Sequence, residues 1–451
     1  MTGDASLLPL TRGYGPQSTF AWSEGRRITV EEFARDASRL ASRLPERRHL
    51  LNLCSSRYRF AVGFAAALLR GQVSLLPPGD TPDVVERLVA SYPDTYCLTD
   101  GPPGASVLDT IVFPDLSGGD SGAPAMPAIA ATQPAAILFT SGSTGEPVPY
   151  PKTWRSLVAS ARAELERLEL VPGLSVLGTV PPQHSYGLES TVLMIMQGGL
   201  AMHAGRPFYP ADIRAELASL PRPRALVTTP VHLRVLLAEA DELPPADLVL
   251  CATAPLSPQL ATEAEARFAA PLHEIYGCTE AGQIATRRTV QSSEWRALPG
   301  IALRRSAGGT SVRGGHVEAE VRLSDVIEQR GGDRFLLHGR TADLVNIAGK
   351  RTSLAHLNFH LNSIEGVLDG VFVVPDEEGA TVQRLAAYVV APGLTADAVM
   401  DALRQRIDPA FLPRPLCLVD FLPRNATGKL PREPLGRIAG ARGTAADPGP
   451  P

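Results

Sequence analysis

A glycine- and hydroxyl-rich run follows a short apolar stretch near the end of the first third of the chain. The stretch covers residues 135–140, and the run reads Phe139-Thr-Ser-Gly-Ser-Thr-Gly145. Glycines leave backbone N–H groups open to a ligand and hydroxyls add donors, so such a loop suits phosphate oxygens. The alternative is a plain flexible turn, but an apolar strand directly before the loop favours a ligand site, because ligand loops lie at the carboxyl ends of such strands. It is not a Walker A loop, because G-x-x-x-x-G-K-[ST] is absent, and there is no GxGxxG.

Three further motifs carry charged groups that suit a nucleotide. Tyr276-Gly-Cys-Thr-Glu280 offers a carboxylate for Mg²⁺, although a lone Glu is often only a solvated side chain. Asp325 and the later Gly339-Arg340 suit ribose hydroxyls or a phosphate, with a salt bridge at the rim as the alternative. Pro423-Arg-Asn-Ala-Thr-Gly-Lys429 ends on a lysine for which a structural role is hard to identify.

The scarcity of lysine draws attention to the positions that keep it. Of the 43 basic residues only three are lysine, namely Lys152, Lys350 and Lys429. Lysine is a compact, flexible point charge, whereas arginine presents a broad planar fork. We therefore expect these lysines to do work that arginine cannot, with chance retention as the alternative.

In this order and spacing, the four motifs resemble those of the adenylate-forming superfamily, over roughly residues 15–440. The superfamily includes acyl- and aryl-CoA synthetases, firefly-type luciferases and adenylation domains of nonribosomal peptide synthetases. The resemblance implies that a carboxylic acid attacks the α-phosphorus of ATP, expels pyrophosphate and is then transferred from the acyl-adenylate to a thiol. The alternative is a non-catalytic nucleotide- or acyl-binding paralogue of the same fold.

The resemblance also implies roles for individual residues, with ATP and Mg²⁺ as cofactors. Lys429 would contact the α-phosphate and the acid, and Glu280, beside Thr279, would hold Mg²⁺ together with Thr144. The residues expected to cradle the pyrophosphate are Thr140, Ser141, Gly142, Ser143, Thr144 and Gly145. Those expected to bind adenine and ribose are Thr253, Ala254, Pro255, Tyr276, Gly277, Asp325 and Arg340.

The segment Pro181-Pro-Gln-His-Ser-Tyr-Gly-Leu-Glu189 resembles one in the coumarate-, benzoate- and acyl-CoA ligase branch. Amino-acid-activating members usually carry an Asp in this region, and none is found here. We therefore expect an aromatic (benzoate- or cinnamate-like) or acyl acid, with His184 as a wall of its pocket or else a core histidine. The thiol would belong to CoA or to a phosphopantetheinylated carrier protein. Three methionines nearby are expected in the core, with a place in the wall of the acid pocket as the alternative: Met194, Met196 and Met202.

Three departures from the family pattern concern the phosphate loop and the hinge. Lys152 follows the loop only after a proline-rich insertion, so it either takes the usual lysine's role or lies too far away. The hinge residue is either Ala342 or Asp343. Lys350 and Arg351 stand where acidic residues are usual, and could face a phosphorylated acceptor. His356 and His360, four residues apart, are expected on a helix surface, because no third metal ligand is near.

These motifs must be positioned by alternating strands and helices, which predicts an α/β fold with doubly wound sheets. Helices are predicted at 29–43, 60–71, 82–91, 155–169, 187–197 and 395–407; strands at 50–54, 96–98, 135–140, 175–180, 225–230 and 247–255; and a long loop at 101–134. A small β-barrel-like subdomain is expected after residue 300. The predicted domains are an adenylation core at 1–340, a mobile α+β domain at 341–440 and a disordered tail at 441–451.

Composition excludes several classes. The net charge of −4 argues against nucleic-acid binding, and 44% hydrophobic with 20% charged residues is typical of a globular protein. The five cysteines form no C-x-x-C pair, which predicts neither a disulfide framework nor a zinc ribbon. The start lacks signal-peptide features and no apolar run is long enough to span a bilayer, so a cytoplasmic protein without membrane insertion is expected.

Overall fold

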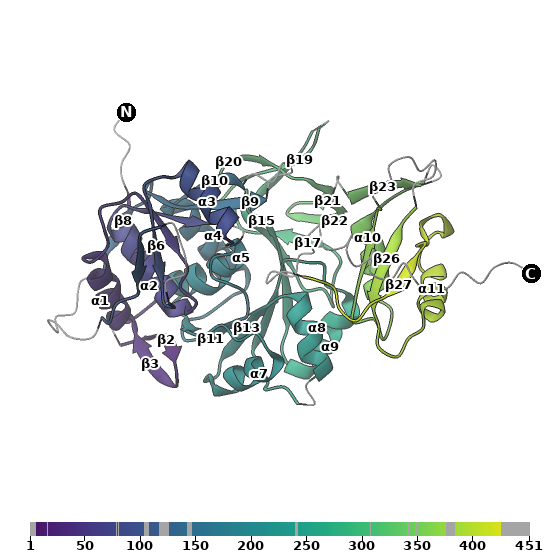
Figure 1. Ribbon diagram of the computed structural model, residues 1–451, viewed down its shortest axis with the longest axis horizontal. Helices are drawn as coiled ribbons and strands as arrows, with labels where there is room; N and C mark the ends of the chain where they lie inside the picture. The colour runs from purple at the N-terminus through teal and green to yellow at the C-terminus, as the bar shows by residue number, and fades with distance from the viewer. Residues whose placement is uncertain are drawn as a thin grey trace, which may run out of the picture.

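A computed structural model gives the structure of most of the chain. It describes residues 6–15, 17–77, 79, 81–102, 108–116, 126–141, 147–239, 242–306, 308–340, 343–347, 350–375 and 384–424. The N-terminal and central parts of the chain build two large sheets with helices around them, and the C-terminal part lies at one end of the molecule (Figure 1).

The first large sheet contains the strand that leads into the predicted phosphate loop. Its strands are β4 (His49–Asn52), β5 (Val73–Leu76), β6 (Thr95–Thr99), β7 (Thr110–Val112), β9 (Pro134–Ser141) and β10 (Pro147–Thr153). The order is β10-β9-β5-β4-β6-β7, and every pair except β10 with β9 is parallel. The prediction of one long loop over 101–134 is wrong in part, because β7 and β8 (Ala128–Ala130, paired with β1, Leu7–Pro9) lie there.

The second sheet has eleven strands and runs through the middle of the molecule. They are β2 (Thr19–Ser23), β3 (Arg26–Thr29), β11 (Ser175–Gly178), β12 (Ala201–His203), β13 (Arg224–Thr228), β14 (Leu248–Cys251), β15 (Leu272–Cys278), β16 (Gly282–Arg287), β17 (Trp295–Ala297), β21 (Asp325–Gly331) and β22 (Arg334–Arg340). The order is β21-β22-β17-β16-β15-β14-β13-β11-β12-β2-β3. Strands β11, β13 and β14 are buried along their whole length and apolar apart from Ser175, Arg224 and Thr228, as parallel strands covered on both faces must largely be.

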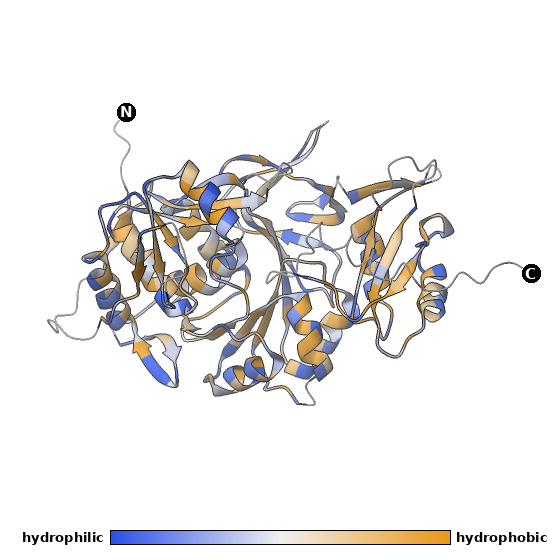
Figure 2. Ribbon diagram, viewed as in Figure 1, coloured by the Kyte–Doolittle hydropathy of each residue, from blue (hydrophilic) through white to orange (hydrophobic). Residues whose placement is uncertain are grey.

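Helices cover both sheets, and the first of them begins at a capping residue. The helices of this part are α1 (Val30–Ala41), α2 (Arg57–Leu69), α3 (Pro82–Ser91), α4 (Trp154–Arg167), α7 (Pro210–Ser219), α8 (Pro230–Glu239) and α9 (Pro258–Phe268). Thr29 and Glu32 form a reciprocal capping box at the start of α1. Figure 2 shows hydrophobic residues gathered in the strands and on the helix faces that pack against them.

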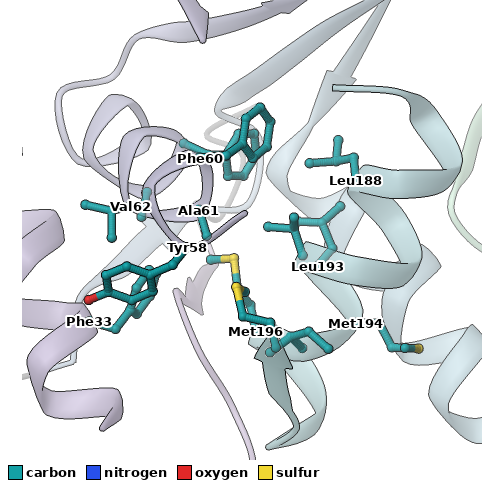
Figure 3. Close-up of a cluster of buried hydrophobic side chains, with 14 of the residues drawn as sticks. Phe33, Tyr58, Phe60, Ala61, Val62, Leu188, Leu193, Met194 and Met196 are labelled. Atoms are coloured by element: carbon teal, nitrogen blue, oxygen red, sulfur yellow. The ribbon is translucent and has the colours of Figure 1, made fainter. Parts of the chain in front are cut away.

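The helix predicted at 187–197 is interrupted by a π-helical turn. It consists of α5 (Ser185–Leu188), the π turn η1 (Glu189–Leu193) and α6 (Met194–Gly198). Met194, Met196 and the neighbouring Met202 are fully buried, which confirms their expected place in the core. Figure 3 shows Met196 directed toward Tyr58 and Ala61 of α2.

The strands expected after residue 300 are divided between two sheets. Strands β18 (Ala302–Ser306), β19 (Gly309–Gly314) and β20 (Val317–Arg322) form an antiparallel three-stranded sheet. Strands β21 and β22 instead join the eleven-stranded sheet through β17. The small subdomain therefore shares its last two strands with the central sheet, and this places Asp325 and Arg340 on that sheet.

The C-terminal part has elements and a core of its own. It contains β23 (Leu344–Ile347), β24 (Lys350–Ser353), α10 (Leu354–Asn362), β25 (Asp369–Val373), β26 (Ala386–Val390), α11 (Ala396–Arg404), the 3₁₀ turn η3 (Pro409–Phe411) and β27 (Leu416–Leu418). One buried cluster, which includes Leu357, Phe372 and Leu403, is drawn only from residues 345–418. In the described parts of the chain, no helix is long and apolar enough to cross a membrane.

Candidate functional site

The Tyr276–Glu280 motif forms the end of β15 and the tight turn into β16. The two strands are antiparallel, with Gly277 opposite Gln283 and Cys278 opposite Gly282. A Cβ on Gly277 would lie 2.5 Å from the carbonyl oxygen of Gly282, so only glycine allows this approach. The glycine therefore brings the turn that carries Thr279 and Glu280 close against the next strand.

Tyr276 connects this motif to Asp325. Its ring is almost fully buried and packs against Trp295 and Phe335, with centroids 5.7 Å and 6.0 Å away. Its hydroxyl donates to Oδ2 of Asp325 over 2.8 Å. Asp325 is the register partner of Arg340 across β21 and β22. Three residues predicted to bind the nucleoside thus lie together, although stacking of Tyr276 on adenine stays a prediction.

Lys152 reaches the same turn from the other sheet. It lies on β10, whose prolines at alternate positions, Pro147, Pro149 and Pro151, all direct their missing N–H groups to the open edge. Every residue of β10 has a register partner on β9, and the Nζ of Lys152 donates to the backbone carbonyl of Glu280 over 2.6 Å. The insertion therefore forms an edge strand that places Lys152 beside Glu280.

Burial tunes the charges at this turn. It lowers the pKa of Lys152, an effect that the nearby carboxylates of Glu189, Glu280 and Glu318 oppose. Burial also raises the pKa of Cys278 to about 12, so this thiol stays protonated next to Glu280. The turn therefore presents Lys152 and Glu280 without a competing thiolate.

A buried carboxylate supports the turn from below. Glu189, at the start of the π turn, accepts hydrogen bonds from Ser160 and Ser185 at 2.8 Å each, and from the backbone N–H of Gln283 at 3.1 Å. The last bond fixes the first residues of β16. Glu189 thereby joins α4, the π turn and β16, the strand that follows the motif turn, and π turns are frequent at functional sites.

A second buried carboxyl group, that of Glu164, lies on α4. Glu164 is fully buried on α4 and accepts a 2.7 Å hydrogen bond from Ser190, which in turn accepts one from the Gln283 amide. Burial raises the pKa of Glu164 to about 8, so it is largely neutral at pH 7.

The predicted adenine segment has a strained backbone. Thr253 has a φ of +84°, which is unusual for a β-branched residue. Strand β14 accordingly ends at Cys251, so the predicted strand over 247–255 is too long. Within the described part of the chain the buried hydroxyl of Thr253 has no hydrogen-bond partner, which fits a polar atom kept for a ligand.

The loop that carries His184 is rigidly held. Gly187 approaches this loop so closely that a Cβ on it would lie 1.9 Å from the carbonyl oxygen of Pro181. The fully buried Arg57 donates to the carbonyls of Gly178 and Val180 at 2.8 Å and 3.0 Å. His184 itself is half-buried at the start of α5, and its role as a pocket wall stays a prediction.

Some of the remaining predicted residues are placed by the structure, and others lie outside the described residues. Lys350 forms an ion pair of 2.6 Å with Asp408, and the rings of His356 and His360 lie 4.5 Å apart on α10. Among the described residues, no group of three acidic, cysteine or histidine side chains could hold a metal ion. Several predictions lie outside the described residues: those for Gly142, Ser143, Thr144, Gly145, Ala342, Lys429 and the tail at 441–451. The same holds for the side chains of Ser141, Arg340 and Arg351.

Two family models match the chain in the order expected from these motifs. The model of the AMP-binding enzyme matches residues 12–313, more than half of the chain, and the model of the AMP-binding enzyme C-terminal domain matches residues 361–429. The chain belongs to the AMP-binding enzyme family. The predicted membership of the adenylate-forming superfamily is thereby confirmed, and with it the class of AMP-forming acid–thiol ligases.

Relatives of this AMP-binding enzyme include two proteins named 4-coumarate–CoA ligase. That of Rhodobacter capsulatus is 31% identical over 277 residues, which cover 58% of this chain and 69% of the relative. That of Halorhodospira halophila is 29% identical over 303 residues, covering 64% and 73%. The o-succinylbenzoate CoA synthetase of Bacillus subtilis, solved with its acyl-adenylate intermediate, shares the fold with a TM-score of 0.78 at 19% identity, covering 95% of this chain and 98% of that one.

Sequence reasoning missed the buried residues that support the site of this AMP-binding enzyme. In the sequence Glu189 stands out only as the last residue of the His184 segment, and Glu164 and Arg57 belong to no motif. A charged residue inside a largely apolar run, such as Glu189 before Ser190-Thr-Val-Leu-Met, is the signal that could have identified it. The partners of Glu164 and Arg57 come from distant segments and leave no such local signal.

Proposed function

We propose that this AMP-binding enzyme adenylates an aromatic or acyl carboxylic acid with ATP and transfers the acyl group to the thiol of CoA. The observation that carries the proposal is that two pairs of predicted residues are in contact at the two ends of one motif, Tyr276–Glu280. Tyr276 contacts Asp325, and Lys152 contacts Glu280, although these residues come from distant segments. Such contacts support a shared ligand with a ribose at one side and phosphates at the other.

In the proposed first step, a carboxylate oxygen of the acid forms a bond to the α-phosphorus of ATP. The bond from that phosphorus to the pyrophosphate oxygen breaks, and pyrophosphate leaves. Asp325, oriented by Tyr276, would accept hydrogen bonds from the ribose hydroxyls. Lys429 would stabilise the charge at the α-phosphorus, and Lys152 would lie near the leaving phosphates.

Mg²⁺ fits this arrangement as a weakly held partner. A single protein carboxylate is enough, because Mg²⁺ usually keeps several waters and binds substrate phosphates. Glu280 is the candidate carboxylate, with Thr144 as a second ligand. Mg²⁺ bound there would neutralise part of the charge on the leaving pyrophosphate.

The acid is proposed to lack an α-amino group, because the His184 segment holds no Asp for an ammonium. The names of the two 4-coumarate–CoA ligases support an aromatic acid, and they support CoA as acceptor in preference to a carrier protein. In the second step the thiol sulfur would attack the acyl carbon and AMP would leave. We propose residues 341–440 as the domain that carries Lys429 to the site.

ATP–pyrophosphate exchange with a panel of benzoates, cinnamates, fatty acids and amino acids tests the first step. We expect a response to one of the acids without an amino group. Exchange with amino acids alone would contradict the substrate class. Silence across the panel, with ATP still bound in calorimetry, would favour the non-catalytic paralogue. Thioester assays with CoA and with a phosphopantetheinylated carrier protein then identify the acceptor.

Lys429→Ala tests the mechanism against a matched lysine. We expect this variant to lose exchange by about 100-fold or more, since a positioned cation at the developing charge is removed. Lys350→Ala removes a lysine paired with the exposed Asp408 and should leave the exchange rate unchanged. Near-wild-type exchange in Lys429→Ala would disprove the proposed role.

A further inference from the structure

Asp369 binds two arginines that come from different parts of the chain. Its Oδ2 accepts from the Nε of Arg424 over 2.6 Å, and its Oδ1 accepts from the Nη2 of Arg424 over 2.9 Å. Arg234 of α8 adds a third bond, from its Nη1 to Oδ1 over 3.3 Å. Asp369 begins β25 in the C-terminal part, whereas α8 follows β13 in the central sheet. One carboxylate therefore connects the two parts of the chain.

The three side chains are largely withdrawn from water. Arg234 is 13% exposed, and Asp369 and Arg424 are 16% exposed each. Burial lowers the pKa of Arg234, while the charge of Asp369 opposes this effect. The fork of Arg424 on both carboxylate oxygens is the geometry that gives the strongest arginine–carboxylate pairs. Exposed ion pairs contribute little, but removing one partner of a buried pair leaves a charge without compensation.

The position of Arg424 in the chain links these ion pairs to Lys429 and so to the proposed adenylation site. Arg424 precedes Lys429 by five residues, which can span at most about 18 Å. Strand β13 leads into α8 and lies between β11 and β14 in the central sheet. His184 follows β11 along the chain, and Thr253 follows β14. If Arg424 is held against α8 through Asp369, Lys429 stays within that reach of α8, which follows a strand ending at the edge of the sheet where the acid and the adenine are expected.

We infer that Arg234, through Asp369 and Arg424, is a positioning residue that holds Lys429 at the adenylation site. The inference rests on the proposed function, in which Lys429 acts on the α-phosphate. Arg234 does not itself touch the substrates. Its loss therefore affects the step that needs Lys429 and leaves nucleotide binding at Asp325 and Tyr276 intact.

The Arg234→Gln variant of the full chain tests the inference when adenylation and thioester formation are measured separately. A misplacement of about 1 Å can cost about 100-fold in rate, so we expect kcat for pyrophosphate exchange to fall between about tenfold and 100-fold, with KM for ATP nearly unchanged. Thioester formation from supplied acyl-adenylate should proceed at the wild-type rate, because no attack on the α-phosphorus is involved. Arg222→Gln is the control, because its partner Asp247 lies in the same part of the chain.

The outcomes separate this inference from the proposed function. Wild-type exchange in Arg234→Gln, with exchange lost in Lys429→Ala, would overturn the inference alone. Equal losses in both half-reactions would also overturn it, since they indicate general misfolding. Exchange retained in Lys429→Ala would overturn both. Arg234→Lys should restore part of kcat, and combining Arg234→Gln with Asp369→Asn should cost less than the sum of the separate effects on ln kcat if the residues act as a unit.

Discussion

At the scale of the residue, Thr253 has a backbone conformation that its own side chain disfavours. A positive φ costs a β-branched residue on the order of 1–3 kcal/mol. The conformation persists because hydrogen bonds hold the residues around it. The backbone N–H of Ala252 donates to the carbonyl of Thr228, and that of Leu256 donates to the side chain of the buried Glu274. Strain kept at this place is consistent with a segment shaped for a ligand and not for stability.

Thr253→Gly should raise the free energy of unfolding by about 1 kcal/mol, because glycine adopts a positive φ without the clash of a Cβ. Denaturant unfolding followed by circular dichroism measures this change. The control, Thr262→Gly in the exposed part of α9, should lower stability by about 0.3 kcal/mol, because threonine is itself a weak helix former. A loss of stability in both variants would show that the Thr253 backbone is not strained.

Gly187→Ala should disrupt the loop that carries His184, since the new Cβ would overlap the carbonyl oxygen of Pro181 at 1.9 Å. We expect a stability loss of about 2 kcal/mol or more and a reduced response to the acid in pyrophosphate exchange. Gly79→Ala, whose Cβ would meet no atom within 4 Å, serves as the control. Unfolding curves that coincide for the two variants would contradict this prediction.

At the scale of the element, helix α4 and the π turn are joined by a carboxyl group that is neutral near pH 7. Glu164 has a pKa of about 8 against a usual value of 4.5, and burial is the main cause. Between these two values the folded state binds more protons than the unfolded state does. Its contribution to stability is therefore greatest at low pH, falls as pH rises from about 4.5 to about 8, and is constant above that.

Glu164→Gln should remove this pH dependence, because the amide has no proton to lose. Denaturant unfolding of wild type and variant at pH 5, 6, 7 and 8 measures it. Relative to wild type, the variant should gain stability by up to about 1.4 kcal/mol per pH unit over this range. Glu166→Gln, an exposed neighbour on α4, should parallel wild type. Parallel curves for Glu164→Gln would disprove the shifted pKa.

At the scale of the whole molecule, the buried core of residues 345–418 is separate from those of the two large sheets. One contact that joins this part to the rest, the Arg234–Asp369 pair, is polar. We therefore expect the C-terminal part to be damaged without loss of the nucleotide site at Tyr276 and Asp325.

Phe372→Ala tests this separation. Phe372 is 1% exposed in the C-terminal core, and its truncation should cost about 3–5 kcal/mol locally. We expect pyrophosphate exchange to be lost while calorimetry still detects ATP. Phe421→Ala, at a side chain 69% exposed, should leave the fold and ATP binding unchanged. Loss of ATP binding in Phe372→Ala would show that the two parts fold as one unit.

The sequence by itself determined the features that depend on neighbours along the chain. Thr29 and Glu32 predict the start of α1, the apolar runs predict the buried strands, and the order of the motifs predicts the family. These follow from local hydrogen bonding and from periodicity. The same local reasoning failed at 101–134, where polar, glycine-rich residues hide the short strands β7 and β8, and at 252–255, where Thr253 ends the strand.

Only the tertiary structure decided which distant residues meet. The register of β10 against β9 brings Lys152 to Glu280, and the position of α8 relative to the start of β25 brings Arg234 to Asp369. The raised pKa of Glu164 likewise depends on how completely other segments exclude water from α4. The two contacts join side chains that are more than 100 positions apart, and the burial of Glu164 depends on several segments that pack around it. No short stretch of the sequence therefore contains this information.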